Sequence, residues 1–166
     1  GAQGPQGNAN VLVDTFTLKN SDFINTTYWF PMSNSSAEGY GAKYFVRNNN
    51  KITTAIIDKG MLLAFFKITN GGITEDLWQP FPVSFVENTT RAYTINYVAT
   101  TAVGKVNIYY FYVPISSGTY PSVYTATVPT INIKLVIVSG TISPNARQGV
   151  DLRDYNAVAK WLNLEN

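Results

Sequence analysis

Cysteine and histidine are both missing from this chain of 166 residues, and charged residues are scarce at 13%. Without these residues the chain cannot build a Ser-His-Asp or Cys-His nucleophile, a zinc site of Cys or His ligands, or a disulfide. Twelve basic and ten acidic side chains leave a formal charge of +2, which gives no broad field to hold a phosphate backbone. We therefore expect no cofactor, no metal site and no nucleic-acid partner.

Long hydrophobic runs are also missing. None approaches the roughly 20 apolar residues that a membrane-spanning helix needs, so we expect no membrane insertion of this domain. The chain opens directly into polar sequence without a signal-peptide pattern, which fits either a cytoplasmic protein or a trimmed fragment. The hydrophobic fraction is 45%, which is enough for one sizeable core, and the length predicts a single domain.

The first seven residues read G-A-Q-G-P-Q-G, with Gly1, Gly4 and Gly7 at a strict period of three. This is the Gly-X-Y phase of a collagen triple helix, in which only glycine fits at the crowded axis. On spacing alone, a flexible polar leader with a cleavage scar is an equal alternative, because the run is short. We assign residues 1–8 to the end of a collagen-like stalk and residues 9–166 to a single head domain.

The composition changes after Gly7 and predicts about eight strands and two short helices. Runs rich in β-branched and aromatic residues, separated by turn residues, favour strands at 11–18, 28–30, 43–47, 61–69, 78–86, 92–101, 105–115 and 131–138. Pro80 and Pro82 predict that the run 78–86 is either an edge strand or a bulged strand, because proline cannot donate to a ladder. The pattern predicts an all-β fold, a mostly antiparallel β-sandwich, with a jelly roll as one form of it.

The two helices are expected at 52–60 and 154–162. In the first, Asn50 or Thr53 can cap the start, and Gly60 lies where a C-terminal capping glycine belongs. In the second, Asp154 is the N-cap, and one apolar stripe is formed by Tyr155, Val158, Trp161 and Leu162. A helix of about ten residues is marginal alone in water, so we expect this stripe to dock on the sheet.

The run 108–113 is aromatic on both faces, which is typical of a central or doubly covered strand. Alternation places Tyr110 and Tyr112 on one face and Phe111 and Val113 on the other. Because Phe111 has no polar atom and Val113 is β-branched, we expect these two to face the core. Tyr110 and Tyr112 would then point outward and be covered by a loop or by another subunit.

Residues that could carry catalysis are few. Glu75 and Asp76 form an acidic pair near Trp78, but adjacent strand residues point to opposite faces, and in a loop such a pair is a solvated turn. Asp151 and Asp154 flank the last helix without the spaced ligands of a calcium loop, so capping explains them better. We expect the protein not to be an enzyme.

Several phrases occur in a fixed order along nearly the whole chain. The triplets run into N-A-N-V at 8–11, and then follow I-T-T-A-I-I-D-K-G at 52–60, W-Q-P-F-P at 78–82, L-V-I-V-S-G at 135–140 and W-L-N-L at 161–164. In this order the chain resembles the C-terminal domain of uncharacterised collagen-like surface lipoproteins of Bacteroidetes, although Ser139 stands where proline is common. The resemblance implies an extracellular or outer-membrane location, anchored through an upstream lipoprotein signal not present in this chain, and it implies no catalytic residues.

Two functions remain open from the sequence. The first is a structural or adhesive head that caps a collagen-like stalk and self-associates, with a trimer as the form that holds three chains in register. The second is a carbohydrate- or host-ligand-binding module, because large rigid aromatic side chains suit such contacts. The candidate ligand-binding residues are Trp29, Trp78, Tyr110 and Tyr112.

Overall fold

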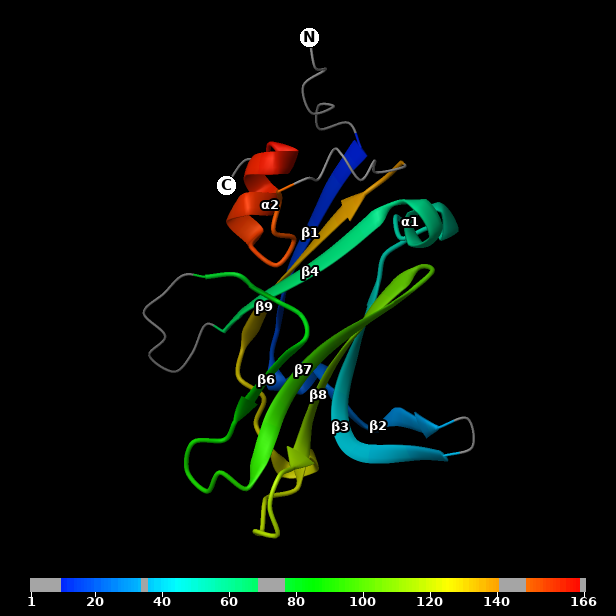
Figure 1. The fold of residues 1–166 in the computed structure, drawn as a ribbon. Helices are drawn as coiled ribbons and strands as arrows, with labels where there is room; N and C mark the ends of the chain where they lie inside the picture. The colour runs from blue at the N-terminus through cyan, green and yellow to red at the C-terminus, as the bar shows by residue number, and fades with distance from the viewer. Residues whose placement is uncertain (1–9, 34–35, 69–76, 141–148, 165–166) are drawn as a thin grey trace.

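The computed structural model describes residues 10–33, 36–68, 77–140 and 149–164. Within these residues, nine strands form two sheets whose paired strands all run antiparallel (Figure 1). The two sheets share one buried apolar core and form a sandwich, so the predicted fold class is confirmed. The predicted stalk residues 1–8 and the pair Glu75 and Asp76 lie outside the described residues.

The first sheet has the strand order β1-β9-β4-β5. Its strands are β1 (Val11–Leu18), β9 (Ile131–Val138), β4 (Met61–Ile68) and β5 (Gln79–Pro80). The bounds of β1 and β9 are those predicted from the sequence, and β4 differs by one residue at its end. Here the pattern was sufficient because these strands are rich in Val, Ile and Leu and end at turn residues.

The second sheet has the order β2-β3-β8-β7-β6. Its strands are β2 (Ile24–Ser33), β3 (Ser36–Asn48), β8 (Lys105–Pro114), β7 (Tyr93–Ala102) and β6 (Val83–Val86). The β7–β8 hairpin is confirmed, with Gly104 at a φ of +80° in its turn. Strands β2 and β3 are longer than predicted, and Pro31 lies within β2, where the register shifts between Pro31 and Ser33.

The segment with two prolines contributes an edge strand to each sheet. Strand β5 ends the first sheet and β6 ends the second, so the chain crosses between the layers at residues 81 and 82. Of the two predicted alternatives the edge position is confirmed, but the single strand predicted at 78–86 is two short strands in different sheets. Proline is tolerated here because an edge strand leaves one row of backbone groups unpaired.

The inner core lies between the sheets, and a second apolar cluster covers the outer side of the first sheet. Along β9 the two sets alternate, with Ile133 and Leu135 in the inner core and Val136 and Val138 on the outer side. We call the second set the helix-side cluster, and its buried members are Met61, Phe65, Val136, Val138, Tyr155, Val158 and Ala159.

Helix α2 (Tyr155–Leu162) completes the helix-side cluster (Figure 1). The Asp154 carboxylate accepts hydrogen bonds from the backbone N–H groups of Asn156 and Ala157, as an N-cap should. Tyr155 and Val158 are buried, whereas Trp161 and Leu162 are half-buried against the same cluster. The predicted docking is confirmed.

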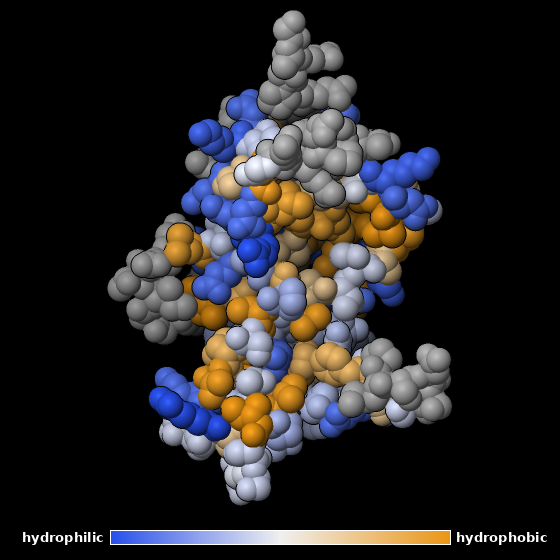
Figure 2. All heavy atoms as spheres, viewed as in Figure 1, coloured by the Kyte–Doolittle hydropathy of each residue, from blue (hydrophilic) through white to orange (hydrophobic). Residues whose placement is uncertain are grey.

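In the space-filling view hydrophilic residues gather over α2, and apolar residues reach the surface between α2 and α1 (Figure 2).

Helix α1 (Thr54–Lys59) begins at the predicted cap, where the Thr53 hydroxyl accepts from the Ile56 N–H. Gly60 follows it, but with a φ of −90° rather than a left-handed conformation. A Cβ at Gly60 would lie 2.5 Å from the carbonyl oxygen of Val138. Glycine is therefore needed for the close approach of two backbones, not for the handedness of a cap.

Strand β8 is the central strand of its sheet, as predicted, but the assignment of its two faces was wrong. Tyr110 and Tyr112 are 3% and 8% exposed and lie in the inner core between the sheets. Their hydroxyl groups are 3.2 Å apart and hydrogen-bond to each other, which offsets part of the cost of burying them. Burial and this bond raise the pKa of Tyr110 far above its usual range.

Phe111 points to the opposite face and is nevertheless 1% exposed. Residues 42–48 of β3 pair with β8, whereas the earlier residues of β3 pair with β2 alone, and β3 bends sharply along its length (Figure 1). Rings of the hairpin thereby reach Phe111, with the Tyr28 ring stacked 4.7 Å from it. We call this set the outer aromatic cluster, and it comprises Tyr28, Phe30, Tyr40, Tyr44, Tyr109 and Phe111.

Candidate functional site

The four aromatic residues predicted to contact a ligand are not brought together. Tyr110 and Tyr112 are inside the sandwich and have no open ring face for a ligand. Trp29 lies on β2 of the second sheet, whereas Trp78 precedes β5 and packs on the helix-side cluster of the first. Of the four, only Trp29 is largely exposed, at 64%.

Trp29 lies directly over a glycine of the neighbouring strand. Trp29 and Gly39 are register partners of β2 and β3, and a Cβ at Gly39 would lie 2.9 Å from Cζ3 of the indole. The ring therefore occupies the space of the missing side chain. An aromatic ring that covers a strand glycine shields the backbone from water and is itself held in place. The rest of the Trp29 indole remains open to solvent.

Tyr124 repeats this arrangement two residues further along β3. A Cβ at Gly41 would lie 3.1 Å from the Tyr124 ring, and the Tyr124 hydroxyl donates to the Thr26 carbonyl at 3.1 Å. Because Gly39 and Gly41 are two apart, both rings cover the same face of β3. Tyr124 comes from the short 3₁₀ helix Val123–Thr125 and is also exposed. We call Trp29 and Tyr124 the aromatic platform.

The sequence analysis missed Tyr124 and the role of the two glycines. The signal was present in the spacing, because glycines two apart in a strand leave one face of it bare. Which ring would fill each space depends on strand register and on a contact across 98 positions of the chain, between Thr26 and Tyr124. The aromatic platform offers two ring faces for stacking and one hydroxyl group, that of Tyr124, which already donates to the Thr26 carbonyl.

Trp78 has a structural environment. The ammonium of Lys134 lies 4.4 Å from the centroid of its indole ring, and that of Lys67 lies 5.2 Å away. Lys134 also donates to the Tyr155 hydroxyl at 2.8 Å. The two lysine stems and α2 thus pack around Trp78, which holds the helix to the sheet. The ligand contact at Trp78 stays a prediction, and the indole ring already contacts Lys67, Lys134 and Tyr155.

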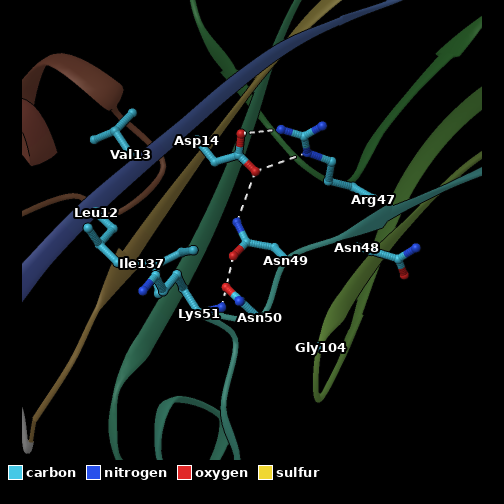
Figure 3. Close-up of a pocket in the computed structure, with 10 residues that line it drawn as sticks. All are labelled: Leu12, Val13, Asp14, Arg47, Asn48, Asn49, Asn50, Lys51, Gly104 and Ile137. Carbon is cyan, nitrogen blue, oxygen red and sulfur yellow. Dashed lines mark hydrogen bonds and ion pairs between the residues drawn. The ribbon is translucent and has the colours of Figure 1, made fainter.

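A polar groove runs along the side of the sandwich between β1 and the end of β3 (Figure 3). Its open volume is about 680 Å³, and a smaller hollow of about 330 Å³ adjoins it and shares Leu12, Asn50, Lys51 and Ile137. Leu12 and Ile137 give the groove apolar lining, and Lys51 and its asparagine neighbours add polar groups.

Three side chains in this groove form one hydrogen-bonded network. Arg47 donates to both carboxylate oxygens of Asp14, at 2.7 and 3.0 Å, and the Asn49 amide donates to the same carboxylate at 2.9 Å (Figure 3). These bonds, with that of Arg47 first, hold the pKa of Asp14 below its usual value. Arg47 also lies 4.6 Å over the Phe16 ring. The network joins the two sheets and uses both oxygens of Asp14, the one carboxylate among the described residues that line the groove.

The described part of the chain contains neither a cluster of metal ligands nor a membrane-spanning helix. Within residues 10–33, 36–68, 77–140 and 149–164, no group of three or more acidic residues is placed to hold a metal ion. No helix in those ranges is long and apolar enough to cross a bilayer.

Comparison with protein families, with curated proteins and with solved structures returned no match for this chain.

Proposed function

We propose that this protein is the non-enzymatic head domain of a collagen-like protein of the bacterial surface. The observation that carries the proposal is the glycine period of residues 1–7, which precedes the first strand by only three residues. The ordered phrases shared with collagen-like surface lipoproteins support it. A head that associates with other heads would raise the local concentration of the stalk chains and so speed nucleation of the triple helix.

Refolding of a triple helix tests this proposal. The protein is extended at its N-terminus by about ten Gly-Pro-Pro triplets and compared with the same triplets without the head. After thermal melting, the circular dichroism of the triple helix should return about tenfold faster with the head, and light scattering should give a mass of three chains or a multiple of three. Equal refolding rates at the same chain concentration would refute a role in assembly.

A second function is supported by the aromatic platform. Trp29 and Tyr124 expose ring faces on one side of the β2–β3 hairpin, and their positions are fixed by the bare backbone beneath them. Rigid exposed aromatic rings suit the apolar faces of sugar rings. We therefore propose a carbohydrate ligand for this platform, in place of the four scattered residues of the sequence prediction.

Binding of oligosaccharides tests the second proposal. The protein is screened on a glycan array, and the affinity for the best soluble oligosaccharide is measured by calorimetry. Trp29→Ala should weaken binding about tenfold, whereas Trp29→Phe should retain most of it, because a ring face remains. Tyr120→Ala is the matched control, since Tyr120 is an exposed aromatic residue outside the platform. Equal affinity of Trp29→Ala and the parent protein would exclude the platform.

A further inference from the structure

The two sheets have four edge strands, and three of them carry features that discourage further pairing. Strand β5 has two residues and contains Pro80, and β6 has four residues and follows Pro82. Strand β2 contains Pro31 and a register shift beside it. Prolines, irregular register and short length are the usual protections of an exposed edge.

Strand β1 has none of these features. It runs for eight residues in unbroken register with β9, and it contains no proline and no lysine. Its one charged residue, Asp14, is held by Arg47 of the same chain. Leu12 and Val13 are 49% and 45% exposed, so the strand presents apolar side chains as well as an open edge.

The register with β9 shows which backbone groups of β1 are unpaired. Ser139 donates its backbone N–H to the Asn10 carbonyl, which sets the phase of the ladder. The even-numbered residues of β1, beginning with Leu12, therefore exchange backbone hydrogen bonds with β9. The odd-numbered residues direct their N–H and C=O groups away from β9, and they are Val11, Val13, Thr15 and Thr17. Within the described residues, no other strand pairs with this row.

Space and charge at this edge suit an additional strand. The groove of Figure 3 lies alongside β1 and is lined by Leu12, Val13 and Asp14 themselves. An added strand would direct alternate side chains toward the groove and the others toward the solvent-facing side, next to Val13 and Thr15. Since Arg47 already neutralises Asp14, two copies of β1 would meet with little repulsion between their carboxylates.

We propose that β1 pairs in antiparallel register with β1 of a second copy of this chain, so that one sheet continues across both molecules. The same row of unpaired groups serves both partners, which makes the contact two-fold and self-complementary. The assembly also stops at two molecules, because each copy contributes its one unprotected edge strand to the contact. The pairing goes beyond the proposed stalk: a triple helix joins three chains at their triplets, whereas β1 joins heads two at a time.

Proline at position 15 tests the pairing without breaking the β1–β9 ladder, because the Thr15 N–H points to the free edge. Thr15→Pro removes that donor and Thr15→Ala is the matched control. Sedimentation equilibrium of the parent 166-residue protein should show a dimer, with the dissociation constant raised at least about tenfold in Thr15→Pro and little changed in Thr15→Ala. Val13→Lys, which adds a charge to the edge and leaves the backbone intact, should weaken the dimer in the same direction.

Amide exchange gives an independent measurement on the parent protein. The Val13 and Thr15 amides should exchange more slowly as protein concentration rises, while the Leu12 amide, bonded to β9, should stay protected throughout. A monomer at every concentration, or equal protection of Val13 and Thr15 at every concentration, would overturn the proposal. A trimer unaffected by Thr15→Pro and Val13→Lys would also overturn it, and would leave the stalk proposal standing.

Discussion

The two sheets of the sandwich both bury the face that points away from the core, and they do so by different means. The first sheet is covered by helix α2, a separate element from the end of the chain. The second sheet is covered by its own β2–β3 hairpin, whose rings fold over Phe111. A helix therefore protects one outer face, and curvature of the sheet protects the other.

The difference decides what could be predicted. A docked helix has a local signature, which is an apolar stripe at a period of 3.6 residues after a capping residue. A curled hairpin has no such signature, because its cover is made by residues distant in the chain. The face of β8 was assigned from the polarity of single side chains, and that criterion fails where both faces are buried.

Removing the buried ring that the β2–β3 hairpin covers should have the largest effect on stability. Phe111→Ala is expected to lower the free energy of unfolding by about 3–5 kcal/mol, because the ring is buried among Tyr28, Phe30 and Tyr40. Urea denaturation measures the change. Phe85→Ala, at an exposed position of β6, is the control and should change it by less than about 1 kcal/mol. Equal losses in both variants would show that the hairpin is not a packed cover.

The helix cover should respond less to its central side chain. Val158 of α2 is fully buried against the first sheet. Val158→Ala should lower the free energy of unfolding by about 2 kcal/mol, since fewer buried atoms are removed than in Phe111→Ala. The control, Asn156→Ala, changes an exposed residue of the same helix. A loss above that of Phe111→Ala would reverse the ranking of the two covers.

The tyrosine pair of the inner core sharpens the contrast, since it lies on the face of β8 opposite Phe111. Tyr110→Phe should cost about 1–2 kcal/mol, because the buried Tyr112 hydroxyl loses its partner. The double variant with Tyr112→Phe should cost less than the sum of the two single variants. Strict additivity in chemical denaturation would show that the two hydroxyl groups are not coupled.

The ion pair between the sheets should give the smallest effect, because it is partly open to solvent. Asp14→Asn is expected to cost about 1 kcal/mol at neutral pH. The folded state lowers the pKa of Asp14, so its contribution is present above the unfolded pKa of about 4 and is lost as pH falls through the lowered value. The difference in stability between parent and variant should therefore shrink toward pH 2, and a constant difference would contradict this role.

The sequence specified the parts of the fold whose signals are local. Strands β1 and β9, the β7–β8 hairpin and the cap of α2 follow from β-branched runs, a turn glycine and Asp154. The extent of β3 was underestimated, because Gly39 and Gly41 weaken the strand pattern where Trp29 and Tyr124 replace their side chains. The aromatic platform depends on that long-range pairing, so only Trp29 could be named in advance.

The alignment of β1 has a mechanical consequence. Strand β1 begins at Val11 beside α2 and leads toward the end of the molecule that carries the β2–β3 hairpin (Figure 1). Tension between a tether before Val11 and an attachment at Trp29 would act along the strand, across its hydrogen bonds with β9. The whole ladder would then have to yield together rather than open one bond at a time, which slows forced unfolding. The domain would therefore resist a pull applied before Val11 best in that direction.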